Sequence, residues 1–121
     1  MESDVVVGKH VYANLYDIDE HIADDEELLK KTVIEAAKLA NAKIHEIKSW
    51  KISGKKGGVS VIALIVESHI AIHTWTQYRY ATVDIYTCGE KTDPWKALEY
   101  IIKVIKPKHY SVYYADRSMI K

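Results

Sequence analysis

The order of strand-forming and helix-forming segments limits this chain to a small set of folds. Alternating or continuous apolar runs are typical of strands, and two segments repeat apolar residues every three or four positions, as helices do. The sequence predicts a strand over 10–16, a helix over 24–41, strands over 44–52, 59–66, 69–74 and 80–86, a helix over 94–105 and a strand over 109–114. The segment 69–74 either continues 59–66 or folds back on it. This order predicts a single α+β domain over 1–121, a two-layer sandwich whose mostly antiparallel sheet carries two helices on one face.

Both predicted helices begin at typical N-terminal signals. Asp24 and Glu27 are spaced like a capping box, and Asn41 is a typical residue after the end of a helix. In the second helix Asp93 is the expected N-cap, and Pro94 occupies the first helical position. These signals support two separate helices.

The strand over 80–86 predicts what each face of the sheet carries. Its alternation places Ala81, Val83 and Ile85 toward the helices, and it places Tyr80, Thr82, Asp84, Tyr86 and Cys88 on the opposite face. The chain has nine tyrosines and no phenylalanine, and tyrosine suits a surface that is half wet or covered by another subunit. We therefore expect a homodimer, with this polar-aromatic face near the partner.

Charge and cysteine content argue against several classes of protein. Lys plus Arg and Asp plus Glu both number 17, so no net charge attracts the chain to nucleic acid or to a membrane surface. Residues 1–10 lack the apolar stretch of a signal peptide, and the apolar run over 59–66 is far shorter than the ~20 residues that span a bilayer. The single cysteine, Cys88, suits a reducing compartment. We therefore expect a soluble, cytoplasmic protein that binds through a local site.

A polar stretch follows the apolar run over 59–66. Residues 67–75 read Glu-Ser-His-Ile-Ala-Ile-His-Thr-Trp, and Cys88 follows on the next predicted strand. Taken singly, Ser68, His73 and Cys88 have ordinary structural explanations as a strand-end hydroxyl, a hydrogen-bonded imidazole and a small buried thiol. Together they supply a nucleophile, a proton shuttle and an acid on neighbouring strands.

Four short motifs, with their spacing, resemble one known family. They are Gly-Val-Ser at 58–60, Glu-Ser-His at 67–69, His-Thr-Trp at 73–75 and Thr-Cys-Gly at 87–89. They resemble the processing and catalytic segments of the small prokaryotic S-adenosylmethionine decarboxylases, which are pyruvoyl-dependent enzymes. The resemblance covers residues 8–118.

By this resemblance the chain cuts itself between Glu67 and Ser68. Ser68 attacks the Glu67 carbonyl, the amide becomes an ester, and elimination and hydrolysis leave a pyruvoyl group at position 68. The resemblance assigns Ser60 and His73 to this processing, which needs an oxygen stabiliser and a proton-transfer group. It implies a β chain of residues 1–67 and an α chain of residues 68–121.

The pyruvoyl group made from Ser68 is the covalent cofactor that the resemblance implies, in place of pyridoxal phosphate. The substrate amine condenses with it to a Schiff base, which accepts the electrons released as carbon dioxide leaves. Cys88 matches the residue that returns a proton to the α-carbon. The alternative for Cys88 is a buried, inert thiol.

The substrate is where this chain departs from the usual pattern of the family. The S-adenosylmethionine enzymes carry an aromatic and proline stretch before Gly-Val-Ser and Pro-Glu after His-Thr-Trp, whereas this chain has Ser-Gly-Lys-Lys-Gly-Gly at 53–58 and Thr-Gln at 76–77. The glycine-lysine loop offers no ring to stack on adenine, and Gln77 cannot bind ribose hydroxyls as a carboxylate does. A branch of the family that converts arginine to agmatine resembles this chain in the loop and in the ending Tyr-Tyr-Ala-Asp-Arg-Ser. We therefore favour L-arginine as the substrate, in polyamine biosynthesis.

An arginine substrate needs a carboxylate to hold its guanidinium. The sequence does not choose among the candidates Asp17, Asp19, Glu46, Asp84 and Asp116. The predicted substrate contacts are Glu67, Gln77 and Asp84.

Four other interpretations compete with this one. The first is an S-adenosylmethionine decarboxylase with the same mechanism, and the second is an uncleaved structural or activating paralogue, against which the intact Ser68, His73 and Cys88 argue. A phosphate-binding loop at Lys-Lys-Gly-Gly is disfavoured, because a strand and not a helix follows it. A zinc site at His69 and His73 lacks further ligands at sensible spacing, so no metal is expected.

Overall fold

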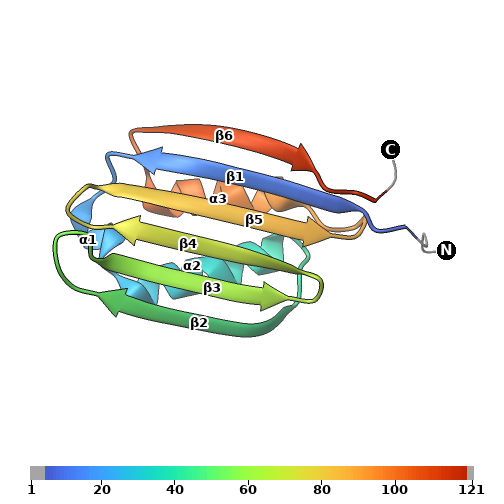
Figure 1. The fold of residues 1–121 in the computed structure, drawn as a ribbon, viewed down its shortest axis with the longest axis horizontal. Coiled ribbons are helices and arrows are strands. Elements are labelled where there is room, and N and C mark those ends of the chain that lie inside the picture. Colours follow the sequence, from blue (N-terminus) through green and yellow to red (C-terminus); the bar gives the residue numbers. More distant parts are fainter. Residues whose placement is uncertain (1–4, 120–121) are drawn as a thin grey trace.

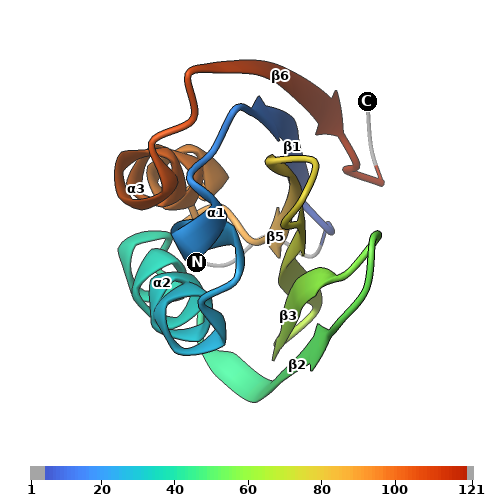
Figure 2. The ribbon, with the colours of Figure 1, turned by 90° about the vertical axis from the view of Figure 1, so that its left-hand side faces the viewer.

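The computed structural model describes residues 5–119, which form a six-stranded antiparallel sheet with helices packed on one face (Figures 1 and 2). The strands are β1 (Gly8–Tyr16), β2 (Ile44–Ile52), β3 (Gly58–Ile65), β4 (Ser68–Trp75), β5 (Tyr80–Cys88) and β6 (His109–Asp116), and the helices are α1 (Glu20–Ala23), α2 (Glu26–Leu39) and α3 (Pro94–Ile105). The strand order is β2-β3-β4-β5-β1-β6, and every neighbouring pair is antiparallel. The predicted α+β sandwich is confirmed, and β4 folds back on β3. Residues 1–4 and 120–121, which the predicted domain over 1–121 includes, lie outside the described residues.

The helix boundaries differ from the prediction at one place. The prediction of a capping box at Asp24 and Glu27 was wrong, because Asp25 is the N-cap of α2. Its carboxylate accepts a hydrogen bond from the Leu28 backbone N–H at 3.0 Å. Asp24 instead ends the short helix α1, which the sequence did not predict, and forms an ion pair with Lys51. The start of α3 is as predicted, with Asp93 as the N-cap followed by proline. No helix within residues 5–119 is long and apolar enough to cross a membrane.

One face of the sheet packs against the helices and forms the hydrophobic core. The alternation along β5 places Ala81, Val83 and Ile85 in this core with at most 1% of their surface exposed, as predicted. The largest fully buried side chains come from both layers: Val11, Leu15, Val59, Val61, Ile70, Ile72 and Ile85 from the sheet, and Leu29, Val33, Ile101 and Ile105 from α2 and α3. Removal of this apolar surface from water holds the two layers together.

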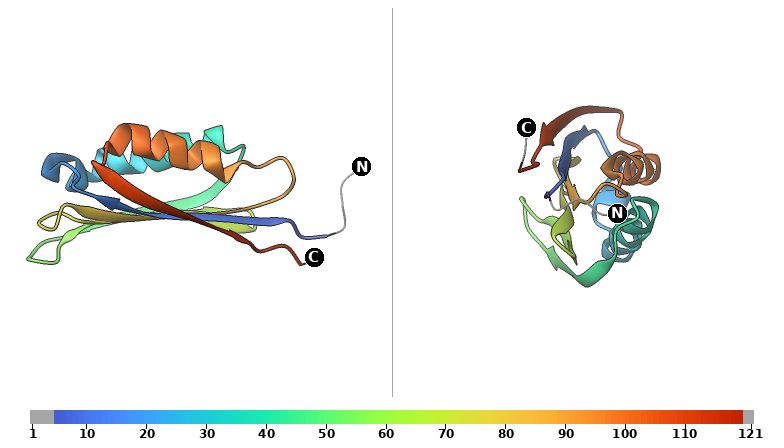
Figure 3. Two further views of the ribbon diagram at one scale, coloured as in Figure 1. Left: turned by 90° about the horizontal axis from the view of Figure 1, so that it is seen from above. Right: turned by 90° about the vertical axis from the view of Figure 1, so that its right-hand side faces the viewer.

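The other face of the sheet carries no helix, as the view from above shows (Figure 3). We call it the open face. It carries the polar and aromatic residues of β5 that the sequence placed there, and these are only partly buried. Because residues two apart on a strand share a face, every strand contributes alternate side chains to this surface. The site residues discussed next lie on the strands of this sheet or in its two hairpin turns, except Arg117, which follows the end of β6.

Candidate active site

Glu67, Ser68 and Cys88 lie together at one end of the sheet, which we call the hairpin end. The tight turn between β3 and β4 consists of Val66 and Glu67, and Ser68 is the first residue of β4, paired with Ile65. The end of β5 lies beside this turn (Figure 1). Glu67 has a φ of 67°, in the left-handed region that costs a non-glycine residue roughly 1–2 kcal/mol. The backbone immediately before Ser68 is therefore strained.

The hydrogen bonds at the hairpin end involve the two carbonyl groups that precede Ser68. The Ser68 hydroxyl donates to the Val66 carbonyl at 3.3 Å, which is a long bond. The Cys88 thiol donates to the Glu67 carbonyl at 3.1 Å. The sequence indicated a proton donor at Cys88, but it gave no sign that this thiol contacts the peptide carbonyl next to Ser68.

Ser60 and His73 form a second group, at the opposite end of the β3–β4 pair. The two residues face each other across the strands, and the Ser60 Oγ lies 2.8 Å from the His73 Nδ1. A Cβ atom at Gly58 would overlap the Thr74 carbonyl oxygen, so glycine is needed for β3 to approach β4 this closely. Gln77 lies in the following turn, between β4 and β5. We call Ser60, His73 and Gln77 the histidine end.

The two groups do not meet within one chain. Ser68 and His73 are five residues apart on the same strand, which corresponds to about 16 Å at ~3.3 Å per residue. Neither side chain can cover that distance. The predicted site residues therefore divide into a group around the Glu67–Ser68 peptide and a group around the His73 imidazole.

A third group lies on the open face between these ends and consists of Asp84, His10 and His69. The His10 Nε2 lies 2.9 Å from one Asp84 carboxylate oxygen, and the His69 Nε2 lies 3.0 Å from the other. Burial alone would raise the pKa of Asp84, but the hydrogen bonds from His10 and His69 outweigh it, and the pKa lies below its usual range. The carboxylate is therefore ionised at neutral pH and accepts a hydrogen bond from each of the two imidazole rings.

Tyr86 and Arg117 pack around this group. The Tyr86 ring makes edge contacts with both imidazoles, at centroid distances of 5.8 Å to His10 and 5.7 Å to His69. The Arg117 guanidinium lies over the same ring, 5.3 Å from its centroid. Hydrogen bonding to Cys88, followed by burial, raises the pKa of Tyr86, so the phenol stays neutral at physiological pH.

The lowered pKa of Asp84 predicts how its contribution to stability depends on pH. Because the folded-state pKa lies below the ordinary value of 3.8, the stabilisation is present above that value and is lost as the pH falls through the folded pKa. In an uncut Ser68→Ala background, Asp84→Asn should lower the melting temperature by about 2–5 °C at pH 7. The gap between the two proteins should narrow below about pH 4. Thermal unfolding followed by circular dichroism checks this, and a gap that is constant from pH 7 to pH 3 would contradict it.

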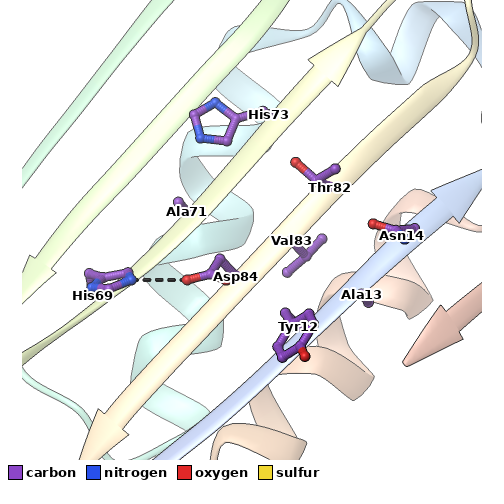
Figure 4. A pocket seen from close by; sticks show the side chains of 9 residues that line it. All are labelled: Tyr12, Ala13, Asn14, His69, Ala71, His73, Thr82, Val83 and Asp84. Atoms are coloured by element: carbon purple, nitrogen blue, oxygen red, sulfur yellow. Dashed lines mark hydrogen bonds and ion pairs between the residues drawn. The ribbon is translucent and has the colours of Figure 1, made fainter. Parts of the chain in front are cut away.

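A hollow of about 420 Å³ lies on the open face between the two ends (Figure 4). His69 and Asp84 line one side of it and His73 lines another, with Tyr12 and Asn14 from β1. The hollow exists because Ala71 and Thr82 are small residues between larger ones. Its volume is in the range of small-molecule sites, and its lining combines polar side chains with a larger share of apolar surface.

Sequence reasoning placed Asp84 on the open face but missed His10 and Arg117 as its neighbours. The alternation over 10–16 was visible in the sequence, but the register of β1 on β5, which sets Tyr12 opposite Asp84, is a tertiary property. Within residues 5–119 no group of three or more His, Cys, Asp or Glu side chains is arranged to hold a metal ion.

The chain is similar to a known family over nearly its whole length. Residues 9–118 match the family model described as S-adenosylmethionine decarboxylase. The crystal structure of the adenosylmethionine decarboxylase from Aquifex aeolicus superposes with a TM-score of 0.86 at 30% sequence identity, covering 96% of this chain and 94% of that one.

Curated relatives with higher identity are named arginine decarboxylase proenzyme. The one from Hyperthermus butylicus is 62% identical, over 97% of this chain and 82% of the relative. The one from Aeropyrum pernix is 57% identical, over 98% of this chain and 89% of the relative. A third, from Ignicoccus hospitalis, is also 57% identical, over 98% of this chain and 82% of the relative.

Proposed function

The chain belongs to the S-adenosylmethionine decarboxylase family, and on that premise we propose that it is the proenzyme of a pyruvoyl-dependent arginine decarboxylase. This carboxy-lyase converts L-arginine to agmatine and carbon dioxide. The observation that carries the proposal is the identity of 57–62% to arginine decarboxylase proenzymes over 97–98% of the chain. The loop over 53–58 and Gln77 favour arginine over S-adenosylmethionine as the substrate, and this agrees with the names of these relatives.

The hairpin end fits a chain that makes its own pyruvoyl group from Ser68. Ser68 follows Glu67 directly in the chain, its hydroxyl donates a hydrogen bond to the Val66 carbonyl, and the left-handed backbone at Glu67 raises the energy of the uncut state. Attack by the Ser68 Oγ turns the amide into an ester, and elimination then releases the Glu67 carboxylate. Hydrolysis by water then releases the backbone nitrogen of residue 68 as ammonia and leaves a ketone at that position. The products are a β chain of residues 1–67 and an α chain of residues 68–121.

Cys88 supports this proposal by its contact with the peptide that would be cut. As the Ser68 Oγ adds to the carbonyl, negative charge develops on the Glu67 oxygen, and the Cys88 thiol already donates a hydrogen bond to that oxygen. The pyruvoyl group supplies an electron-accepting carbonyl at the substrate's amino group. In the reaction with substrate, we propose that Cys88 donates the proton that takes the place of the lost carboxylate on the substrate α-carbon.

The separation of the two ends supports a homodimer with shared sites. If Ser60 and His73 act in the cut, as the family pattern implies, they cannot do so on their own Ser68, about 16 Å away. A twofold axis makes contacts reciprocal, so the hairpin end of one protomer can lie on the histidine end of its partner, and the reverse. We propose that the His73 imidazole, held by Ser60, moves protons at the partner's hairpin end.

The surface of the open face also supports its burial against a second copy. Six large apolar or aromatic side chains on this face are between 38% and 57% exposed: Tyr12, Tyr16, Trp50, Ile52, Leu64 and Tyr113. Exposed apolar groups spread over a whole sheet face are typical of interaction surfaces. Two open faces packed together would cover them and enclose the hollow.

Glu67, Gln77 and Asp84 remain the predicted substrate contacts. Glu67 is exposed beside Ser68, and Gln77 lies in the turn of the histidine end. Asp84 lies between the two ends, but both of its oxygens already accept hydrogen bonds from imidazoles. A guanidinium at Asp84 would share these carboxylate oxygens with the two rings, because each oxygen has a second lone pair.

A cytoplasmic location is part of the proposal. Cys88 has to stay reduced in order to donate a proton, and thiols persist in reducing compartments.

A direct assay of the two substrates tests the proposed function. Purified, processed protein should release agmatine from L-arginine and should show at least about a hundredfold lower kcat/KM for S-adenosylmethionine, because the chain lacks the stacking ring and the carboxylate that bind the nucleoside. Labelled carbon dioxide release gives the rates, and chromatography identifies the amine. Turnover of S-adenosylmethionine without turnover of arginine would show that the alternative specificity is correct. Absence of both activities in a fully cut protein would contradict the enzyme assignment.

A further inference from the structure

We propose that His10, Asp84 and His69 form a clamp that keeps the start of the α chain in the sheet after the chain is cut, which makes Asp84 a positioning residue for the group at position 68. We call these three residues the imidazole clamp. This inference rests on the proposed cut between Glu67 and Ser68. It concerns what holds the reactive end in place and not how the cut is made.

The cut removes the covalent link that fixes the first residues of β4. In the uncut chain the two-residue turn Val66–Glu67 holds Ser68 against Ile65. After the cut both strands end at this point, and new chain ends fray unless other contacts hold them. The group that reacts with substrate would then stand on the first residue of a free strand end. After the cut, only the ladder pairing to β3 and β5 and side-chain contacts close to position 68 can hold this end.

His69 is placed to make such a side-chain contact. It is the second residue of the α chain, next to position 68, and its ring reaches Asp84 on the neighbouring strand β5 at 3.0 Å. Asp84 lies opposite Ala71 on β4 and opposite Tyr12 on β1. His69 and His10 are each two residues nearer the hairpin end, so the two rings reach the same carboxylate diagonally from both sides, as cross-strand neighbours can. The clamp thus joins β4 to β1 through β5.

The hydrogen-bond directions of the clamp are fixed by Arg117. Its Nη1 lies 3.3 Å from the His10 Nδ1, and a guanidinium can only donate. The His10 Nδ1 is therefore the acceptor, and its Nε2–H donates to Asp84. The ionised Asp84 carboxylate is an acceptor only, so the His69 Nε2–H donates to it as well. Each of the two carboxylate oxygens thus receives a definite imidazole donor.

The residues around the clamp restrict the movement of both rings. Tyr86 makes edge contacts with the two imidazoles, and Tyr12 packs against His10 at a centroid distance of 5.0 Å. The Arg117 guanidinium lies over the Tyr86 ring. The charged and titratable groups around Asp84 are His10 and Tyr12 from β1, His69 from β4, Tyr86 from β5, Arg117 just after β6, and His73 on another side of the hollow. The carboxylate at the centre carries the only negative charge among these groups at neutral pH.

Hydrogen exchange in processed protein tests the clamp. Asp84→Asn removes the carboxylate that accepts two charge-assisted hydrogen bonds. In the processed variant without substrate, the amides of residues 69–72 should therefore exchange about ten to a hundred times faster than in the processed, unmodified protein. In the uncut Ser68→Ala background the same change should accelerate exchange by less than about threefold, because the turn still holds the strand. Cleavage itself should proceed within about threefold of the unmodified rate.

The chain offers a matched control at Asp17. Its carboxylate lies 2.6 Å from the His109 Nε2, so Asp17→Asn also removes a histidine–carboxylate contact. Asp17 has a φ of 56°, which asparagine tolerates, so the backbone is not strained by the change. This variant should leave exchange over 69–72 unchanged. Equal exchange in processed Asp84→Asn and Asp17→Asn proteins would overturn the clamp.

A second pair of variants keeps the inference testable if Asp84→Asn folds poorly. His69→Gln retains an N–H donor near the Nε2 position, whereas His69→Leu removes it. The glutamine variant should retain slow exchange over 69–72, and the leucine variant should lose it. A raised KM for arginine in Asp84→Asn together with unchanged exchange over 69–72 would mean that Asp84 acts on the substrate alone, which would also overturn the clamp. An unmodified chain that is never cut refutes the proposed function, whereas a normal cut with unchanged exchange refutes only the clamp.

Discussion

Ser68→Ala is expected to remain a single chain of 121 residues, whereas the unmodified protein is expected to separate into fragments of residues 1–67 and 68–121 on a denaturing gel. Alanine lacks the oxygen that attacks the Glu67 carbonyl, and no other hydroxyl is part of that peptide. Without the cut no ketone forms at position 68, so arginine decarboxylation should fall to the background rate. Intact mass spectrometry measures the cut, and the new C-terminal fragment should be blocked to Edman sequencing.

Ser53→Ala is a suitable control for this substitution. Ser53 is an exposed residue of the loop between β2 and β3, so removal of its hydroxyl should leave cleavage and turnover unchanged. An unmodified chain that stays whole under assay conditions would contradict the self-cleaving mechanism. A Ser68→Ala chain that is still cut at the same bond would show that another group performs the attack.

His73→Ala is expected to slow the cut by about a hundredfold or more, since general acid–base groups contribute roughly that much. If the two ends of the site meet only between protomers, the loss should be repaired in trans. A mixed dimer of His73→Ala and Ser68→Ala chains has one site with both an intact Ser68 and an intact His73. Cleavage should then appear in the His73→Ala chain and only after the two proteins are mixed.

The mixing experiment distinguishes shared sites from separate ones. The two variants are unfolded together and refolded, with an affinity tag on one of them so that the fragments can be assigned by mass. If His73 acts within its own chain, the mixture should remain uncut like its two components. A Ser60→Ala chain should behave like His73→Ala in the same mixture, because the Ser60 hydroxyl holds the His73 ring at 2.8 Å.

Packing of two open faces would also change the electrostatic environment of Asp84. If open faces pack together, the imidazole clamp and the hollow become buried between the sheets, where a charge interacts more strongly with its neighbours than at an exposed surface. The pH dependence expected for Asp84 should then be steeper in the dimer than in a variant that stays monomeric.

Local patterns in the sequence were enough to predict most of the secondary structure. Strict alternation identifies β1 and β5, because a strand with one face in a core repeats with a period of two. Asp93 followed by proline marks the start of α3 for a local reason, since the N-cap accepts a hydrogen bond from an N–H only two or three residues away. The start of α2 was misplaced by one residue, because four consecutive acidic side chains, at 24–27, offer more than one possible cap.

The sequence by itself determined the two-layer arrangement, which residues of β5 face the helices, and the family motifs around Ser68, because each depends on residues close together in the chain. Only the tertiary structure decided which of these residues meet. It separated Ser60 and His73 from Ser68, since β4 is extended and the register of β3 on β4 sets Ser60 opposite His73 and not opposite Ser68. It also brought His10 and His69 to Asp84, because that contact depends on the register of three strands that are distant in sequence, and a slip of one residue would turn those side chains to the other face.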